Sequence, residues 1–225
     1  MSAWIQHVKA TQQKHKCSYK DAMIKAKSTY QRGGALPTDT LRKVLDNSYT
    51  QTRDDIDGYK VDKSLSGKRA QVYVNADGKA IVSHRGTSGL HDVLTDMKYV
   101  MGQLGTTKRL KHARRIQKEA EAKYGSQNTT TVGHSLGSVL AQKVGRNSAE
   151  IITMNKPVGI WDMRRKIRDI QTDIRTTRDP VSFLRPFQKG AKALEIQSHS
   201  FSPLVEHSYN TLSRLTQLWR QQVGI

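Results

Sequence analysis

The sequence predicts an α/β fold with a mostly parallel central sheet flanked by helices, preceded by a small helical segment. Residues 129–141 pass from β-branched residues through a glycine-rich turn into a run that suits a helix. Two apolar-alternating runs, residues 71–74 and 79–83, flank an Asp-Gly turn and predict a β-hairpin. The short apolar run 151–154 is typical of a buried parallel strand.

Length and local signals divide the chain into two parts. We expect a basic N-terminal helical segment at residues 1–34 and one larger domain at residues 35–225, which is long enough for a sizeable core. Ser18 and Asp21 form a capping box that predicts the start of a helix in the first part. No apolar run approaches the about 18 residues that span a membrane, and the N-terminus is polar. We therefore expect neither a signal peptide nor a transmembrane helix, and an intracellular location.

The charge of the chain is strongly one-sided. Lys and Arg number 38 against 19 Asp and Glu, which leaves a net charge of +19. Such a surface should attract polyanions, either nucleic acid or anionic lipid headgroups, although it could also serve solubility alone. The single cysteine, Cys17, excludes an internal disulfide framework. No Cys/His cluster has metal-ligand spacing and no glycine-rich loop has a phosphate-binding lysine, so no metal or cofactor is expected.

The remaining elements follow from hydrophobic spacing. A helix is predicted from Thr38, with a polar run from Asn47 to Asp57 after it. Residues 108–124 form a long amphipathic pattern, which predicts a helix that covers the sheet. Beyond residue 154, the pattern predicts a basic helical excursion over 161–170 and a strand over 172–176.

The stretch Gly133-His134-Ser135-Leu136-Gly137 carries the strongest chemical signal. It lies between a predicted strand and a predicted helix, the context of the nucleophile elbow in α/β-hydrolases. Side chains at the two glycine positions would collide with the neighbouring strand or helix. Ser135 would project from the apex, beside backbone N–H groups that favour negative charge. A glycine-rich turn with an inert serine is the alternative.

Further residues extend this motif into a family pattern. Residues 85–87, Arg-Gly-Thr, end a predicted strand, and Asp92 follows before the elbow. This order resembles the class 3 (fungal-type) lipases over about residues 38–220. The resemblance implies an oxyanion hole formed by the backbone N–H groups of Thr87 and Leu136, with Asp92 steadying Thr87 and His134 supporting the elbow. Val93 departs from the pattern, because an aromatic residue often stands at this position in the family.

The same resemblance implies a catalytic acid and a histidine further along the chain. Asp179, in Asp-Pro-Val after a predicted strand, matches the acid of the family, although an Asp-Pro pair by itself favours a simple turn. The histidine must follow the acid, because this fold presents Ser, acid and His in that order. His207 is preferred because it is expected in a loop just before a helical pattern that runs to Trp219, where the family carries its histidine. His199, in a serine-rich loop, remains the alternative.

Two segments have less determinate roles. Leu90–Gly105 is apolar with little charge, and in the family a mobile lid occupies this region, although the pattern favours an ordinary buried helix. In the N-terminal segment, residues 4–9 (Trp-Ile-Gln-His-Val-Lys) followed by residues 18–22 (Ser-Tyr-Lys-Asp-Ala) resemble a short basic N-terminal segment on proteins of large eukaryotic DNA viruses and virophages. A helical hairpin that only packs on the main domain is the alternative.

Together the motifs favour a serine esterase or lipase that hydrolyses glycerolipids or phospholipids through Ser135, His207 and Asp179. The N-terminal resemblance implies a virus-encoded enzyme of the host cytoplasm or virion that acts at anionic host membranes. One alternative keeps the chemistry on a soluble ester or a protein acyl group. The other is a basic virion or nucleic-acid-associated protein that uses an inactive hydrolase fold as a scaffold.

Overall fold

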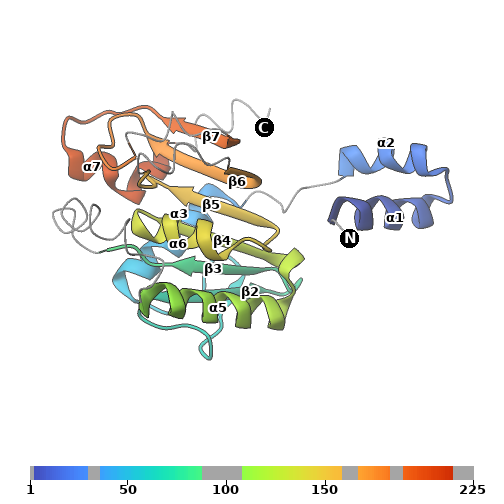
Figure 1. Cartoon of the computed structure of the whole chain (residues 1–225), viewed down its shortest axis with the longest axis horizontal. Coiled ribbons are helices and arrows are strands. Elements are labelled where there is room, and N and C mark those ends of the chain that lie inside the picture. The colour runs from blue at the N-terminus through green and yellow to red at the C-terminus, as the bar shows by residue number, and fades with distance from the viewer. Residues whose placement is uncertain (1–2, 30–35, 88–107, 159–166, 183–189, 215–225) are drawn as a thin grey trace. The chain divides into compact units, whose positions relative to one another are not determined.

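The computed structural model describes residues 3–29, 36–87, 108–158, 167–182 and 190–214 (Figure 1). The chain forms two compact units, Met1–Leu36 and Pro37–Ile225. The first holds two helices, and the second holds a sheet with its covering helices.

The N-terminal unit is a pair of helices, α1 (Ala3–His15) and α2 (Tyr19–Thr29). Val8 and Ala22 are fully buried where the helices meet, with Cys17 packed against them. The Ser18 hydroxyl accepts a hydrogen bond from the Asp21 N–H at 3.1 Å and donates to its carboxylate at 2.6 Å. The capping interaction that the sequence predicts is therefore formed at the start of α2.

The second unit is built on a seven-stranded sheet in the order β1-β2-β3-β4-β5-β6-β7. The strands are β1 (Tyr59–Val61), β2 (Ala70–Asn75), β3 (Ala80–His84), β4 (Thr129–His134), β5 (Glu150–Met154), β6 (Ile167–Thr176) and β7 (Gly190–Ile196). Strands β1 to β3 pair antiparallel, and β3 to β7 pair parallel. The predicted α/β fold with a mostly parallel sheet is confirmed. The predicted hairpin is β2 and β3, with Val72 opposite Val82.

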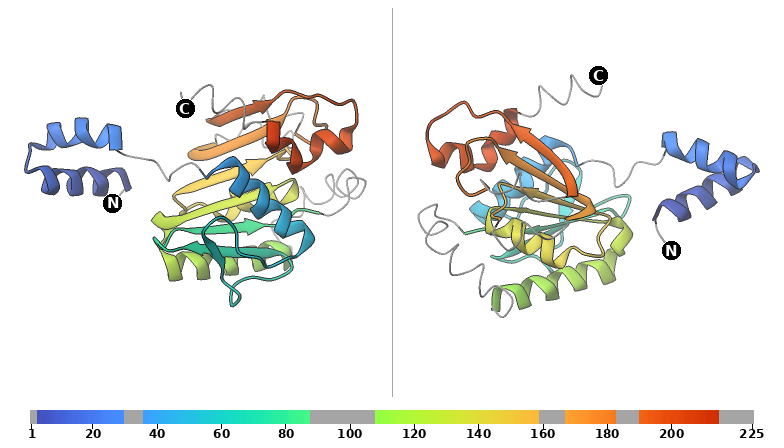
Figure 2. Two further views of the ribbon diagram at one scale, coloured as in Figure 1. Left: turned by 180° about the vertical axis from the view of Figure 1, so that it is seen from behind. Right: turned by 45° about the horizontal axis from the view of Figure 1, so that its top comes forward.

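Helices cover both faces of this sheet. The crossover helices α5 (Lys108–Tyr124) and α6 (Leu136–Val144) lie on one face, and α3 (Thr38–Thr50) lies on the other (Figure 2). Helix α5 has the bounds that its amphipathic pattern predicts. All five residues of β3 are buried, as expected for a strand between two helical layers.

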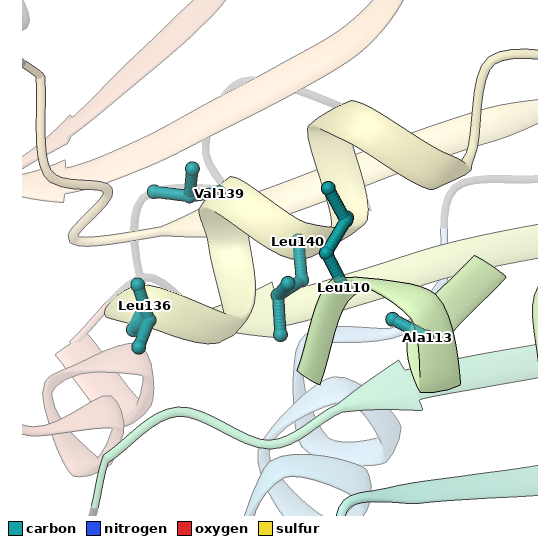
Figure 3. Close-up of a cluster of buried hydrophobic side chains, with 5 residues drawn as sticks. All are labelled: Leu110, Ala113, Leu136, Val139 and Leu140. Atoms are coloured by element: carbon teal, nitrogen blue, oxygen red, sulfur yellow. The ribbon is translucent and has the colours of Figure 1, made fainter. Parts of the chain in front are cut away.

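A compact apolar cluster joins the two crossover helices. Leu110 and Ala113 of α5 meet Leu136, Val139 and Leu140 of α6 (Figure 3). All five are less than one-tenth exposed. Because Leu136 directly follows Ser135, this packing fixes the first turn of α6 against α5.

Helix α3 is longer than its apolar pattern indicates. Asn47 and Ser48, predicted to begin a polar connection, are buried within α3. The Asn47 amide donates to the Tyr73 hydroxyl at 3.2 Å, and the Ser48 hydroxyl lies 2.6 Å from that of Ser83. These polar side chains are satisfied by the sheet beneath them, which allows the helix to continue to Thr50.

The C-terminal third differs from prediction in two strands. Residues 167–170, expected in a helical excursion, begin β6, because Ile167 is buried and pairs with Gly190. Residues 161–166 lie outside the described residues. Strand β7 was not predicted at all. Its sequence, Gly-Ala-Lys-Ala-Leu-Glu-Ile, contains several residues that are uncommon in strands, and pairing with β6 decides its conformation.

The chain then forms a short helix, α7 (Pro203–His207), and a 3-10 segment, Tyr209–Arg214. His207 is thus the last residue of a helix rather than part of a loop, and the predicted continuation to Trp219 lies outside the described residues. Within the described ranges, no helix combines the length and the apolar character needed to cross a bilayer.

A buried ion pair lies within the parallel part of the sheet. Lys156 Nζ is 2.9 Å from the Asp173 carboxylate, and both side chains are at most 3% exposed. Thr153 and Gln171 also donate to Asp173, and Gln142 of α6 accepts from Lys156 at 2.7 Å. These additional partners offset the removal of both charges from water.

Candidate active site

The turn between β4 and α6 holds Ser135 in an unusual backbone conformation, with φ 55° and ψ −129°. A non-glycine residue in this region costs about 1–3 kcal/mol and persists only where its surroundings enforce it. Here the Ser135 N–H donates to the Met154 carbonyl at 2.9 Å, and its carbonyl accepts from the Ser138 N–H at 2.9 Å. The elbow is therefore tied both to β5 and to the first turn of α6.

Two glycines allow the close packing that this turn requires. A Cβ at Gly133 would collide with the Gly137 backbone and lie 2.7 Å from the Ser138 nitrogen. A Cβ at Gly137 would collide with the His84 carbonyl and lie 2.9 Å from the Gly86 nitrogen. The helix start, the elbow strand and the end of β3 thus approach too closely for any side chain.

The Ser135 side chain is buried, and its hydroxyl has no hydrogen-bond partner within the described part of the chain. The Nε2 atom of His207 is likewise buried without a partner. Buried polar atoms without partners are uncommon, because each carries a desolvation cost of about 1–3 kcal/mol. Both atoms are free to interact with a reacting group.

The other ring nitrogen of His207 faces Asp179. Its Nδ1 lies 2.7 Å from Asp179 Oδ1, and both side chains are buried. Asp179 also accepts from the N–H groups of Val181 at 3.2 Å and Ser182 at 2.8 Å, and from the Ser182 hydroxyl. These donors orient the carboxylate, and because a carboxylate oxygen accepts, His207 Nδ1–H is the donor to Asp179.

Of the two candidate histidines, only His207 contacts Asp179. The His199 side chain is exposed, and its backbone N–H donates to the Glu206 carboxylate at 3.1 Å. Glu206 is buried and is paired with Arg214 at 2.9 Å. The N–H groups of His199 and Ser200 both donate to Glu206, which ties their loop to α7 one residue before His207.

His134, next to the serine, connects the elbow to His207. Its Nε2 is 2.6 Å from the His207 carbonyl oxygen, and its Nδ1 is 2.8 Å from the Tyr49 hydroxyl. Burial, with a smaller contribution from His207, lowers the pKa of His134 to about 3, so the ring is neutral. A carbonyl only accepts, so Nε2–H donates to His207, and the Tyr49 hydroxyl donates to Nδ1.

Asn155 holds the same carbonyl from the end of β5. Its amide donates to the backbone oxygens of Glu206 and His207, each at 3.0 Å, and its own side-chain oxygen accepts from the Thr176 N–H at 2.9 Å. Its φ of 46° is a second left-handed conformation in the site. The His207 backbone is thereby fixed by two donors, one from each neighbouring strand end.

The predicted oxyanion residues lie at adjacent ends of β3 and α6. A Cβ on Gly86 would be 3.3 Å from the Ser135 Cβ and 2.6 Å from the His134 carbonyl, which brings residues 85–87 beside the elbow. Thr87 is half-buried directly after Gly86. Leu136 begins α6, and the first N–H groups of a helix have no intrahelical partner. Asp92, Val93 and the predicted lid at Leu90–Gly105 lie outside the described residues.

Three residues of the site were not singled out as site residues in the sequence. They are Asn155, Tyr49 and Ser182. Tyr49 belongs to α3, and its ring also stacks on Tyr209 with centroids 5.3 Å apart. No local motif marks such contacts, because they join segments far apart in the chain. Among the described residues, no group of three or more His, Cys, Asp or Glu is placed to hold a metal ion.

No family model and no curated protein matches the sequence. Among solved structures, a lipase of Rhizomucor miehei in its propeptide complex is 16% identical, with 66% of this chain and 62% of that chain covered and a TM-score of 0.40. A triacylglycerol lipase from Penicillium expansum is 16% identical, with 74% and 80% covered and a TM-score of 0.43. An esterase/lipase from an uncultured bacterium is 12% identical, with 87% and 94% covered and a TM-score of 0.39. This chain thus spans 62% of the Rhizomucor lipase chain, and likeness at such identity concerns the fold alone.

Proposed function

We propose that the chain is a serine hydrolase of carboxylic esters, an esterase or lipase, with Ser135, His207 and Asp179 as its catalytic triad. The observation that carries the proposal is the state of His207, whose Nδ1 is bound to a buried carboxylate while its Nε2 is buried without a partner among the described residues. The Ser135 hydroxyl, on a strained turn beside His134, completes the set needed for nucleophilic catalysis, and the His134 ring lies 4.9 Å from that of His207.

In the first half of the reaction, Ser135 Oγ bonds to the ester carbonyl carbon while His207 Nε2 takes the hydroxyl proton. The carbonyl oxygen becomes an oxyanion, which the N–H groups of Thr87 and Leu136 stabilise by about 3–4 kcal/mol each. Collapse of this intermediate breaks the bond to the alcohol, which leaves with the proton from His207. An acyl-enzyme on Ser135 remains.

In the second half, water adds to the acyl carbon while His207 takes one of its protons. Collapse releases the carboxylic acid and returns the proton to Ser135. Asp179 stays ionised throughout and stabilises the imidazolium that forms in each half. Asn155 and His134 keep the His207 backbone in place, so the ring changes its charge without moving.

The test is hydrolysis of short- and long-chain p-nitrophenyl esters, combined with labelling by a fluorophosphonate. Ser135→Ala is expected to lower kcat by a factor of about 10⁴ or more and to abolish labelling. Ser126→Ala, at the other end of β4, serves as the matched control and should retain both. Equal and negligible turnover in the wild type and Ser135→Ala would contradict the proposal and would favour an inactive hydrolase scaffold.

Exposed apolar residues near His207 support action at a membrane surface. Phe201, Leu204 and Val205 are 89%, 63% and 43% exposed, and they precede His207 directly. The Arg178 guanidinium lies 4.6 Å from the Phe201 ring centroid. Apolar side chains beside a cation, on a chain with net charge +19, suit an anionic lipid surface. We therefore propose glycerolipids or phospholipids as substrates.

Co-sedimentation with vesicles tests this surface. Phe201→Ser with Leu204→Ser should weaken binding to phosphatidylglycerol vesicles, whereas Ile24→Ser, an exposed apolar residue of α2, should not. Retention on DNA that falls steeply with salt, without vesicle binding, would instead favour the nucleic-acid-associated alternative. The resemblance of residues 1–34 to segments of viral proteins supports a virus-encoded enzyme that acts on host membranes.

A further inference from the structure

A group of arginines without acidic partners lies beside the elbow. Arg69 and Arg85 are cross-strand neighbours at the ends of β2 and β3, where the Arg85 N–H donates to the Arg69 carbonyl at 3.0 Å. Arg109, in the first turn of α5, donates through Nη2 to the Arg85 carbonyl at 2.5 Å. Among the described residues, no carboxylate forms an ion pair with any of the three.

This arrangement is electrostatically unfavourable as it stands. Like charges on directly opposite strand residues repel, and a cation in the first turn of a helix opposes the positive end of the helix dipole. The first turn of α5 contains no acidic residue. Burial, together with Arg69 and Arg85, lowers the pKa of Arg109. An anion bound among the three guanidinium groups would remove each of these unfavourable terms.

Arg109 also has a hydrogen-bonding group to spare. Its Nε is buried and has no partner within the described part of the chain. A guanidinium bound through one Nη, with Nε unoccupied, retains a donor for a tetrahedral oxyanion or a carboxylate. Arginine is suited to this task because its planar fork matches phosphate oxygens.

The arginines lie next to the reacting serine. Gly86, which follows Arg85, would bring a Cβ within 3.3 Å of the Ser135 Cβ. The Arg85 guanidinium is 5.9 Å from the Tyr49 ring centroid, and the Tyr49 hydroxyl binds His134, the neighbour of Ser135. This proximity allows one ester molecule to reach both Arg85 and Ser135.

We propose that Arg69, Arg85 and Arg109 form an anion subsite that binds the phosphate of the ester substrate. The preferred substrate class is then the phosphate-containing glycerolipids, hydrolysed at the acyl ester. The proposal rests on the ester hydrolase function above. It concerns binding of one substrate group and adds no chemical step.

The test compares two monomeric esters with the same acyl chains, dihexanoyl phosphatidylglycerol and uncharged dihexanoylglycerol, below their critical micelle concentrations. The readout is the ratio of the two kcat/KM values. The wild type should favour the phosphate ester, and Arg85→Gln and Arg69→Gln should each lower the ratio about tenfold. Arg114→Gln, an exposed arginine of α5, is the matched control and should leave the ratio unchanged. Arg109 is not substituted, because it also supports the Arg85 carbonyl.

Binding to Ser135→Ala, measured by calorimetry with dihexanoyl phosphatidylglycerol, separates the subsite from catalysis. If the wild type hydrolyses neither ester, the hydrolase function fails. The subsite is still supported if adding Arg85→Gln to Ser135→Ala weakens binding of dihexanoyl phosphatidylglycerol. A wild type without preference for the phosphate ester overturns the proposal, as does an equal loss in Arg85→Gln and Arg114→Gln. If the wild type binds inorganic phosphate at Arg85 but does not prefer the phosphate ester, the arginines form a free-phosphate site and the substrate assignment is overturned.

Discussion

The Tyr49 hydroxyl offers a test of how His207 is held in place. Tyr49→Phe removes one O–H group and keeps the ring, which stacks on Tyr209 at 5.3 Å. The Nδ1 atom of His134, now 2.8 Å from that hydroxyl, would lose its donor inside the protein. The Nε2 atom of His134 binds the His207 carbonyl at 2.6 Å, so the effect of Tyr49→Phe is transmitted to the proposed triad through the His134 side chain.

The expected magnitudes follow from this geometry. A buried acceptor without a donor destabilises the fold by about 1–3 kcal/mol, and each kcal/mol lowers Tm by about 2–4 °C in a protein of this size. With the His134 ring less constrained, its hydrogen bond to the His207 carbonyl is held less firmly, and Asn155 is the donor that the substitution leaves unaffected. We expect kcat to fall about tenfold, which corresponds to a barrier increase of about 1.4 kcal/mol.

Tyr73→Phe provides a matched control. Tyr73 is fully buried, and its hydroxyl donates to Gln71 at 2.5 Å and accepts from Asn47 at 3.2 Å. Its removal should destabilise the fold to a similar extent, yet none of its hydrogen-bond partners belongs to the elbow or the triad. We therefore expect Tyr73→Phe to lower Tm and leave kcat unchanged.

The assay is thermal unfolding together with p-nitrophenyl ester kinetics well below Tm. A lower kcat in Tyr49→Phe alone, with KM little changed, would support positioning of His207. The reasoning is wrong if Tyr49→Phe keeps the full kcat, or if both variants lose kcat equally, because the hydroxyl would then serve stability only.

Three further outcomes are expected. Burial lowers the pKa of His84 to about 4 and that of His134 to about 3, both below the usual value of 6.5. Below pH 6.5 the unfolded chain therefore binds more protons than the folded chain, and the urea concentration at the unfolding midpoint should decrease as the pH is lowered. Each histidine lowers the free energy of unfolding by about 1.4 kcal/mol per pH unit, down to its folded pKa. A midpoint that stays constant from about pH 7 to 5 would refute this. Lys156→Met leaves the Asp173 carboxylate buried without its cation and should destabilise the fold by about 3–5 kcal/mol, as measured by urea unfolding. Adding Asp173→Leu should restore the free energy of unfolding. Gly86→Ala should lower both Tm and kcat, because its methyl group would lie 2.6 Å from the His134 carbonyl; unaltered kinetics would show that the end of β3 can move away from the elbow.

Local pattern was informative wherever neighbouring residues determine the conformation. The strand, turn and helix around Ser135 depend on glycines within two residues of it, and the structure shows β4 and α6 on either side of a strained serine. The β2–β3 hairpin and α5 likewise follow from alternation and helical spacing within each segment. A periodic apolar pattern contains its own register, so such elements are predictable from short windows.

Strand β7 and the first residues of β6 could not be predicted in this way. Residues such as Gly190 have little strand preference, and their conformation depends on hydrogen bonds to a neighbouring strand. Asn47 and Ser48 were similarly misassigned, because their polarity is satisfied by Tyr73 and Ser83 across the sheet. The contacts that decide these segments lie far away in sequence.

The sequence by itself determined the fold class and the elbow, because glycine spacing and hydrophobic periodicity act over a few residues. The resemblance to class 3 lipases added a short set of candidate partners for Ser135. Only the tertiary structure decided that His207 rather than His199 meets Asp179, that Tyr49 reaches His134, and that Arg69 and Arg85 face each other. These decisions depend on strand order and on which ends of parallel strands come together. They are properties of the assembled sheet, and no short stretch of sequence contains them.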